Sequence, residues 1–102
     1  MIRHIVLCRF RADVSESEIA EIWAGLEALK DVIPGMIAAS FGANVSPEGL
    51  ARGYGHAFTM DFENETVRDA YLEHPAHKAA GARLVGALDG GVDGLCVLDF
   101  GV

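Results

Sequence analysis

The residues best suited to move protons lie in a short stretch that ends with His74-Pro75-Ala76-His77. Pro75 has no backbone N–H and disfavours helical geometry at the residue before it. One helix is therefore expected to end near Glu73 and another to begin at Pro75. His77 then falls in the first turn of the second helix, where the amide groups carry partial positive charge. Because that environment keeps an imidazole neutral, His77 is predicted to accept a proton as a general base.

Two more groups would complete a site for acid–base chemistry around His77. Tyr71 carries a phenol, which can donate a hydrogen bond to a developing oxyanion. Asp99 is predicted to lie on the inward face of the last strand, where a carboxylate without a partner is costly. Such a carboxylate can fix the tautomer of an imidazole through its second ring nitrogen. We therefore predict His77 as the base, Asp99 as its orienting partner and Tyr71 as the oxyanion donor.

A cavity between a sheet and its helices is expected to hold these groups. His4 begins the helix-facing set of the first predicted strand, and His56 begins that of the third. If these strands are neighbours, both imidazoles would converge with Asp99, Tyr71 and His77. Cys8 lies on the same strand face as His4 and is included among the predicted substrate-binding residues, although its position in the middle of a strand also fits the core. The predicted substrate-binding residues are His4, Val6, Cys8, His56, Phe58, Leu95 and Val97.

A structural role is the alternative for each of these side chains. A histidine near a strand end, such as His4 or His56, is often a buried residue that needs only a hydrogen-bond partner. Tyr71 would then be a core ring with a satisfied hydroxyl, and His77 would cap its helix. A zinc site built from the four histidines, with His74 as the fourth, remains open on residue type. Two histidines spaced three residues apart are nevertheless a weak signal for a metal.

Side-chain alternation predicts strands at residues 2–11, 36–45, 54–62 and 94–100. A capping box at residues 15–18 predicts a first helix of about four turns, which Pro34-Gly35 ends. Asn64 is expected to cap a helix over residues 65–73, and Pro75 to begin one that continues to about residue 88. The residues expected to face the core from these last two helices are Val67, Ala70, Tyr71, Leu84 and Leu88.

The resulting order β-α-β-β-α-α-β fits one α+β domain over residues 1–102 with a ferredoxin-like, four-stranded antiparallel sheet and its helices on one face. The other face of this sheet would carry Ile5, Leu7, Leu98 and Phe100. Such a face is too apolar to leave in water. A second copy of the chain, packed sheet against sheet in a symmetric dimer, is the expected cover.

Composition narrows the classes of partner. The 102 residues are 51% hydrophobic, and 8 Lys and Arg against 15 Asp and Glu give a net charge of -7. An acidic chain without a basic cluster is a poor partner for nucleic acid or for an anionic membrane. No signal peptide or membrane span is apparent, so a cytoplasmic location is expected. Cys8 and Cys96 have no metal-like spacing and are expected to be reduced.

The chain as a whole resembles the stress-responsive dimeric α/β-barrel (Dabb) proteins. The resemblance is carried by residues 2–7, 33–35, 46–49, 53–57, 62–63, 71, 74–77 and 98–100. It implies a ferredoxin-like monomer whose sheet pairs with that of a second copy to form a barrel. A plant polyketide cyclase of this family performs an intramolecular aldol condensation without a cofactor. The resemblance implies that His77, Tyr71 and Asp99 match its base, its tyrosine and its aspartate, and that His4 and His56 match its other pocket histidines.

The sequence therefore leads to one main hypothesis and two rivals. The main hypothesis is a homodimer with a small-molecule pocket that catalyses cofactor-free acid–base chemistry, of lyase or cyclase type, on an apolar carbonyl compound. The first rival is a ligand-binding or stress-protective protein without catalysis. The second is a cofactor-independent monooxygenase of the kind found on related barrels. The small residues Ala80 and Gly81 stand where the cyclase has bulky ones, which predicts a cavity of different shape.

Overall fold

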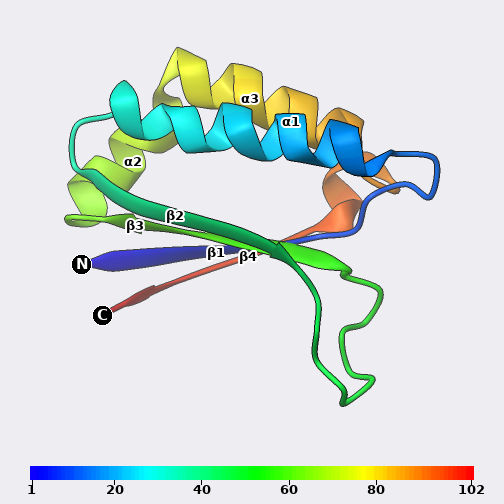
Figure 1. Ribbon diagram of the computed structural model, residues 1–102. Coiled ribbons are helices and arrows are strands. Elements are labelled where there is room, and N and C mark those ends of the chain that lie inside the picture. The colour runs from blue at the N-terminus through cyan, green and yellow to red at the C-terminus, as the bar shows by residue number, and fades with distance from the viewer.

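A four-stranded antiparallel sheet carries all the helices on one of its faces in the computed structural model, which describes residues 1–102 (Figure 1). The strands are β1 (Ile2–Cys8), β2 (Met36–Ala43), β3 (His56–Phe62) and β4 (Leu95–Gly101), in the spatial order β2-β3-β1-β4. The helices are α1 (Glu16–Glu27), α2 (Glu65–Glu73) and α3 (Pro75–Gly86), with 3-10 helices η1 (Ala28–Asp31) and η2 (Gly91–Gly94). The predicted ferredoxin-like fold is confirmed.

The element ends differ from those predicted by a few residues. β1 stops at Cys8 rather than at residue 11, because the backbone of Arg9 turns to bond with Gly94 and Asp89. β2 ends at Ala43 and β3 begins at His56, so the loop between them is longer than predicted. The helix expected to reach residue 88 ends at Gly86. In β1, β2 and β3 the alternation continues past the last ladder hydrogen bonds, which explains why these strands are shorter than predicted.

Side-chain caps fix where the helices begin. The Ser15 hydroxyl accepts a hydrogen bond from the Glu18 N–H at 3.1 Å, and Asn64 accepts from the Val67 N–H at 2.9 Å. Each cap satisfies an amide that would otherwise have no partner in the first turn. None of the three helices combines the length and the apolar character needed to cross a bilayer.

Gly35 lets the chain turn from η1 into β2 close to α2. Its φ is +88°, a conformation that favours glycine. A Cβ added at this position would lie 2.8 Å from a methyl carbon of Val67 on α2. The glycine of the Pro34-Gly35 pair therefore serves both the turn and the close approach of α2 to the sheet.

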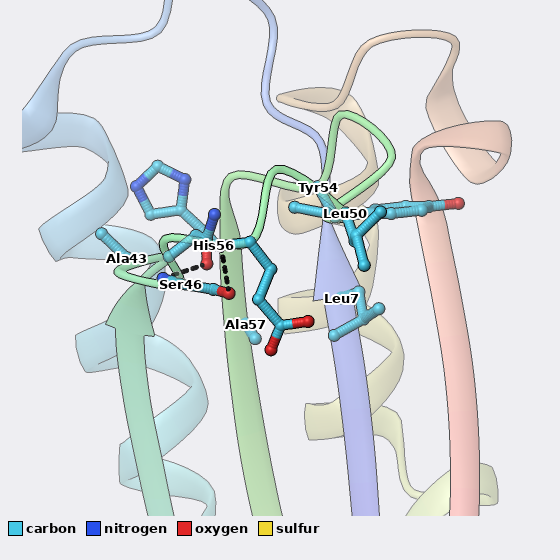
Figure 2. Close-up of a pocket in the computed structure, with 10 residues that line it drawn as sticks. Leu7, Ala43, Ser46, Leu50, Tyr54, His56 and Ala57 are labelled. Carbon is cyan, nitrogen blue, oxygen red and sulfur yellow. Dashed lines mark hydrogen bonds between the residues drawn. The ribbon is translucent and has the colours of Figure 1, made fainter.

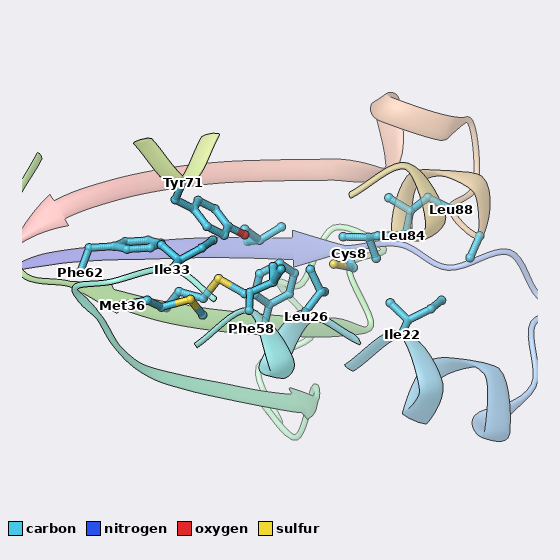
Figure 3. Packing of buried hydrophobic residues seen from close by; sticks show 14 residues of the cluster. Cys8, Ile22, Leu26, Ile33, Met36, Phe58, Phe62, Tyr71, Leu84 and Leu88 are labelled. Atoms are coloured by element: carbon cyan, nitrogen blue, oxygen red, sulfur yellow. The ribbon is translucent and has the colours of Figure 1, made fainter. Parts of the chain in front are cut away.

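The core fills the space between the sheet and the helices (Figure 3). Val67 and Tyr71 of α2 face this core as predicted, whereas Ala70 is exposed. The prediction for Ala70 was wrong because Val67 and Tyr71 lie at the centre of the inward face of α2, with Ala70 on one side of them and Arg68 on the other. The side of Arg68 is the one that faces the sheet, where Arg68 contacts Asp99. Leu88 is buried as predicted, although it lies beyond the end of α3. The most deeply buried large side chains are Tyr71, Phe62, Leu26, Met60 and Cys8.

The face of the sheet opposite the helices is bare in the single chain (Figure 1). Leu98 is 66% exposed and Phe100 is 50% exposed on this face, and Ile5 is only partly buried. Arg3 of β1 and Asp61 of β3 form a two-point ion pair across it at 2.9 and 3.1 Å. The apolar character predicted for this face is therefore present in the structure.

Candidate functional site

A cavity of about 380 Å³ opens between the sheet and helices α1, α2 and α3. The residue Val6 at its floor lies opposite Phe58 of β3 and opposite Val97 of β4, so one row of apolar side chains crosses three strands. The complete lining is His4, Val6, Leu26, Phe58, Tyr71, Leu72, His77, Lys78, Gly81, Leu84, Val85, Leu95 and Val97. Most of the residues predicted from the sequence therefore meet in one apolar cavity.

The turn between α2 and α3 brings Tyr71 and His77 together. Tyr71 lies in the last turn of α2, and Pro75 occupies the first position of α3. Nδ1 of His74 accepts a hydrogen bond from the Ala76 N–H at 3.0 Å, so His74 is the cap of α3. The ring centroids of Tyr71 and His77 are 4.2 Å apart as a result. The cap His74 and the first residue Pro75 of α3 thus position Tyr71 and His77 next to each other.

The tautomer of His77 follows from its backbone contact. Nδ1 lies 3.3 Å from the carbonyl oxygen of Leu72. A carbonyl oxygen only accepts, so Nδ1 carries the proton and Nε2 keeps its lone pair. A Cβ added at Gly81 would lie 3.7 Å from Nε2, which places this nitrogen beside the cavity-lining Gly81. His77 therefore presents an unprotonated nitrogen at the cavity.

Burial lowers the pKa of His77 below its ordinary value of 6.5. Positive charge on the neighbouring His4, His74 or Lys78 disfavours a protonated His77 and lowers this pKa further. The hydrogen bond to the Leu72 carbonyl raises it. The net direction is downward. His77 is consequently neutral at pH 7 and able to take up a proton.

Tyr71 is a protonated phenol with an unused hydroxyl. The residue is 1% exposed, and burial raises its pKa well above the ordinary value. Its ring packs against Phe62 at 4.8 Å between centroids. The hydroxyl makes no hydrogen bond within the protein, yet the structure contains no fully buried side-chain oxygen without a partner. The oxygen of Tyr71 is therefore reached from the cavity, where it can donate a hydrogen bond.

Asp99 contacts His4 rather than His77, contrary to the prediction. His4 and Asp99 are directly opposite each other on β1 and β4, and Nδ1 of His4 lies 2.7 Å from Oδ1 of Asp99. The other oxygen, Oδ2, accepts from Arg68 at 2.8 Å. Burial raises the pKa of Asp99, but the hydrogen bonds from Arg68 and His4 outweigh it and the net pKa is lowered. The orienting partner expected for His77 is instead the carbonyl of Leu72.

Three predicted site residues do not line the cavity, namely Asp99, His56 and Cys8. Because β1 and β3 are antiparallel, the first residue of one strand pairs near the last of the other, so His56 faces Cys8 and lies at the far end from His4. The imidazole of His56 packs against the rings of Phe10 and Trp23, 5.1 and 6.3 Å away between centroids. Cys8 is fully buried in the core, where burial raises the pKa of its thiol to about 12.

His56 lines a second hollow of about 280 Å³ beside the loop between β2 and β3 (Figure 2). Leu7, Ser46, Leu50 and Tyr54 also line this hollow. The four histidines do not gather, and the structure has no group of three or more His, Cys, Asp or Glu side chains that could hold a metal ion. The zinc alternative thus finds no ligand set.

Part of the helical wall of the cavity was not predicted from the sequence, namely Leu26 of α1 and Lys78 and Val85 of α3. Gly81, which was expected to affect the shape of the cavity, and Leu84, which was expected to face the core, also line it. A signal was available, because Gly81 follows His77 by four residues and Val85 follows by eight, which places them on one helix face. Arg68 was also missed. It precedes Tyr71 by three residues on α2, so the same rule predicts that both point toward the site.

Proteins similar to this chain in sequence and structure fit this architecture. A Stress-response A/B barrel domain-containing protein, HS1, from Arabidopsis thaliana is 35% identical over 86% of this chain and 81% of its own length. Olivetolic acid cyclase from Cannabis sativa is 30% identical over 78% of this chain and 79% of its own. The crystal structure of a dimeric ferredoxin-like protein of unknown function from Jannaschia sp. superposes with a TM-score of 0.90 at 31% identity, covering 99% of this chain and 98% of that one.

The family model of the stress responsive A/B barrel domain matches residues 2–102, which is nearly the whole length of the chain. This chain belongs to the Dabb family.

Proposed function

We propose that this protein is a cofactor-free acid–base catalyst of lyase or cyclase type that acts on an apolar carbonyl compound. One observation carries the proposal: the Leu72 carbonyl fixes His77 with Nε2 unprotonated, beside the phenol of Tyr71 and the apolar cavity. A base and a hydrogen-bond donor at one end of a dry pocket are the minimum that enolate chemistry needs. The similar protein olivetolic acid cyclase is, by its name, a cyclase, which supports the cyclase form of the proposal.

The reaction would begin with removal of a proton from the carbon next to a carbonyl group. Nε2 of His77 takes this proton, and the electron pair of the broken C–H bond moves onto the carbonyl oxygen. The hydroxyl of Tyr71 donates a hydrogen bond to that oxygen and stabilises its developing charge. In a cyclase the enolate carbon then attacks a second carbonyl of the same molecule, and His77 returns its proton to the new alkoxide. Buried apolar walls such as Val6 and Phe58 reduce the access of water to these steps.

We further propose that two copies of the chain pair through the bare face of the sheet. Leu98 and Phe100 would lose their exposure to water in such a pair, which is favourable for an apolar surface of this kind. The similar protein from Jannaschia sp. is described as dimeric. A symmetric pair uses the same patch twice, as a flat sheet face allows.

Proton exchange tests the catalytic proposal without knowledge of the natural substrate. The protein is incubated with 2-octanone in D₂O, and loss of the protons next to the carbonyl is followed by NMR. We expect exchange above the buffer rate, abolished by His77→Ala and unaffected by His56→Gln, since His56 lies outside the cavity. If 2-octanone shifts cavity resonances but exchanges no faster than in buffer, the protein is a binder and the catalytic proposal fails.

A further inference from the structure

A chain of polar contacts runs from helix α2 across β4 to β1 behind the cavity. Nε of Arg68 donates to Asp69 at 2.9 Å, and its terminal nitrogen donates to Oδ2 of Asp99 at 2.8 Å. Oδ1 of Asp99 in turn accepts from Nδ1 of His4 at 2.7 Å. The side chains of Arg68, Asp99 and His4 are only 22%, 19% and 8% exposed. The contacts are therefore shielded from water and stronger than a surface ion pair.

Both oxygens of Asp99 are used, so the carboxylate has one orientation. Arg68 holds one oxygen in place, and the other is left in line with His4. Arg68 also favours the ionised form of Asp99, consistent with its lowered pKa. An ionised carboxylate only accepts hydrogen bonds, so Nδ1 of His4 must carry the proton. The Asp99 carboxylate thus fixes the position of the proton on His4, and Arg68 holds that carboxylate in place.

The other ring nitrogen of His4 is left for a ligand. Nε2 makes no hydrogen bond within the protein, and no buried side-chain nitrogen without a partner exists in the structure. Since His4 lines the cavity and is only 6% exposed, Nε2 is reached from the cavity. In the neutral imidazole with its proton on Nδ1, Nε2 is a hydrogen-bond acceptor. The cavity therefore offers two acceptors, on His4 and His77, and one donor, the hydroxyl of Tyr71.

We propose that Arg68 is a positioning residue, which anchors Asp99 so that His4 presents an accepting Nε2 that selects ligands carrying a hydroxyl group as well as a carbonyl. In the complex the ligand carbonyl accepts from Tyr71, while a phenol or enol hydroxyl donates to His4. An apolar ketone without the hydroxyl leaves Nε2 of His4 without a partner in a dry cavity, which costs binding free energy. The inference rests on the proposed function only in placing the ligand carbonyl at Tyr71.

Nitrogen NMR of histidine-labelled protein reads the tautomer directly. In the wild type we expect His4 to show a protonated Nδ1 and an unprotonated Nε2. In Arg68→Met we expect the two signals to move toward a mixture of tautomers, and in Arg68→Lys to stay close to the wild type. The control is Arg83→Met, which breaks the exposed contact of Arg83 with Glu21 and should leave His4 unchanged. Unchanged His4 signals in a folded Arg68→Met variant would overturn the proposal.

Ligand binding supplies the second readout, with 3′-hydroxyacetophenone and acetophenone as the two compounds. We expect the wild type to bind the hydroxylated ketone on the order of tenfold more tightly, and Arg68→Met to lose this preference while Arg83→Met keeps it. Equal binding of both ketones by the wild type contradicts the inference. If Arg68→Met does not fold, Arg68→Gln replaces it in both experiments. A protein that shows the tautomer and the preference but no ketone exchange would refute the proposed catalysis and leave this inference standing.

Discussion

The ring of Tyr71 lies 4.2 Å from the ring of His77, although the two residues belong to different helices. Tyr71 belongs to the core, at 1% exposed, whereas His77 is only partly buried. Tyr71 is therefore a hydrogen-bond donor held in place by the core, and the neighbouring His77 is a base that a ligand can still reach.

Removal of the Tyr71 hydroxyl should affect catalysis and not folding. Tyr71→Phe keeps the packed ring and removes an oxygen that has no partner in the protein. We expect ketone exchange to fall by roughly 100-fold, as for other lost oxyanion donors. The free energy of unfolding, measured with urea, should change by less than about 0.5 kcal/mol. Tyr71→Ala is the contrasting variant and should lose about 3–5 kcal/mol through the cavity it leaves. A strongly destabilised Tyr71→Phe would show that the hydroxyl is structural.

The pH dependence of exchange should report the lowered pKa of His77. His77 must be neutral to accept a proton, so the rate falls as the pH drops through its pKa. Because burial and the nearby His4, His74 and Lys78 lower that pKa, the midpoint is expected below the ordinary 6.5. The measurement is the rate of proton exchange into 2-octanone from about pH 4.5 to about pH 8. A midpoint above 6.5 is incompatible with the environment described.

Loss of the Asp99 charge should remove part of the pH dependence of stability. A carboxyl whose pKa is lowered by folding stabilises the protein above its unfolded pKa, and this stabilisation is lost as the pH falls through the folded pKa. We therefore expect Asp99→Asn to be less stable than the wild type at pH 7. The difference should shrink below the ordinary value of 3.8. Urea unfolding of both proteins at neutral and acidic pH measures this. A difference that does not depend on pH would mean that packing, not charge, is what Asp99 supplies.

A charge on the bare sheet face should separate the proposed dimer. Leu98→Glu places a carboxylate on the strand face that a second copy would cover. We expect sedimentation to show a dimer for the wild type and a folded monomer for this variant. Val92→Glu is the matched control, because Val92 is 67% exposed in η2, away from the sheet. A wild type that sediments as a monomer at micromolar concentration would remove the dimer from the proposal.

The fold could be predicted from the sequence because the patterns that decide it are local. Alternation at β1 and β3, the caps Ser15 and Asn64 and the proline after α2 each act within a few residues. The strand order then follows from the ferredoxin-like topology. The placement of Tyr71 and His77 beside the main cavity could be predicted for the same reason, because the turn between α2 and α3 positions both residues.

The partners within the site could not be predicted in the same way. His56 was placed with His4 because both begin a strand, but antiparallel pairing separates the two starts by the length of the strand. Asp99 was assigned to His77, whereas register places it opposite His4. The spacing of Arg68 and Tyr71 places both on one face of α2, but the choice of Asp99 as the partner of Arg68 depends on how α2 docks on the sheet.

The cap of α3 has a further consequence for how this pocket could change over time. His74 and Pro75 set the spacing of the donor and the base from within one corner of the chain, whereas the walls around them come from distant strands and from the outer turns of α3. Substitutions at positions such as Gly81, Val85 or Val97 can therefore reshape the chamber without disturbing the reactive corner. A fold built in this way can acquire new substrates through substitutions in the residues that line the cavity, while Tyr71 and His77 keep their relative position.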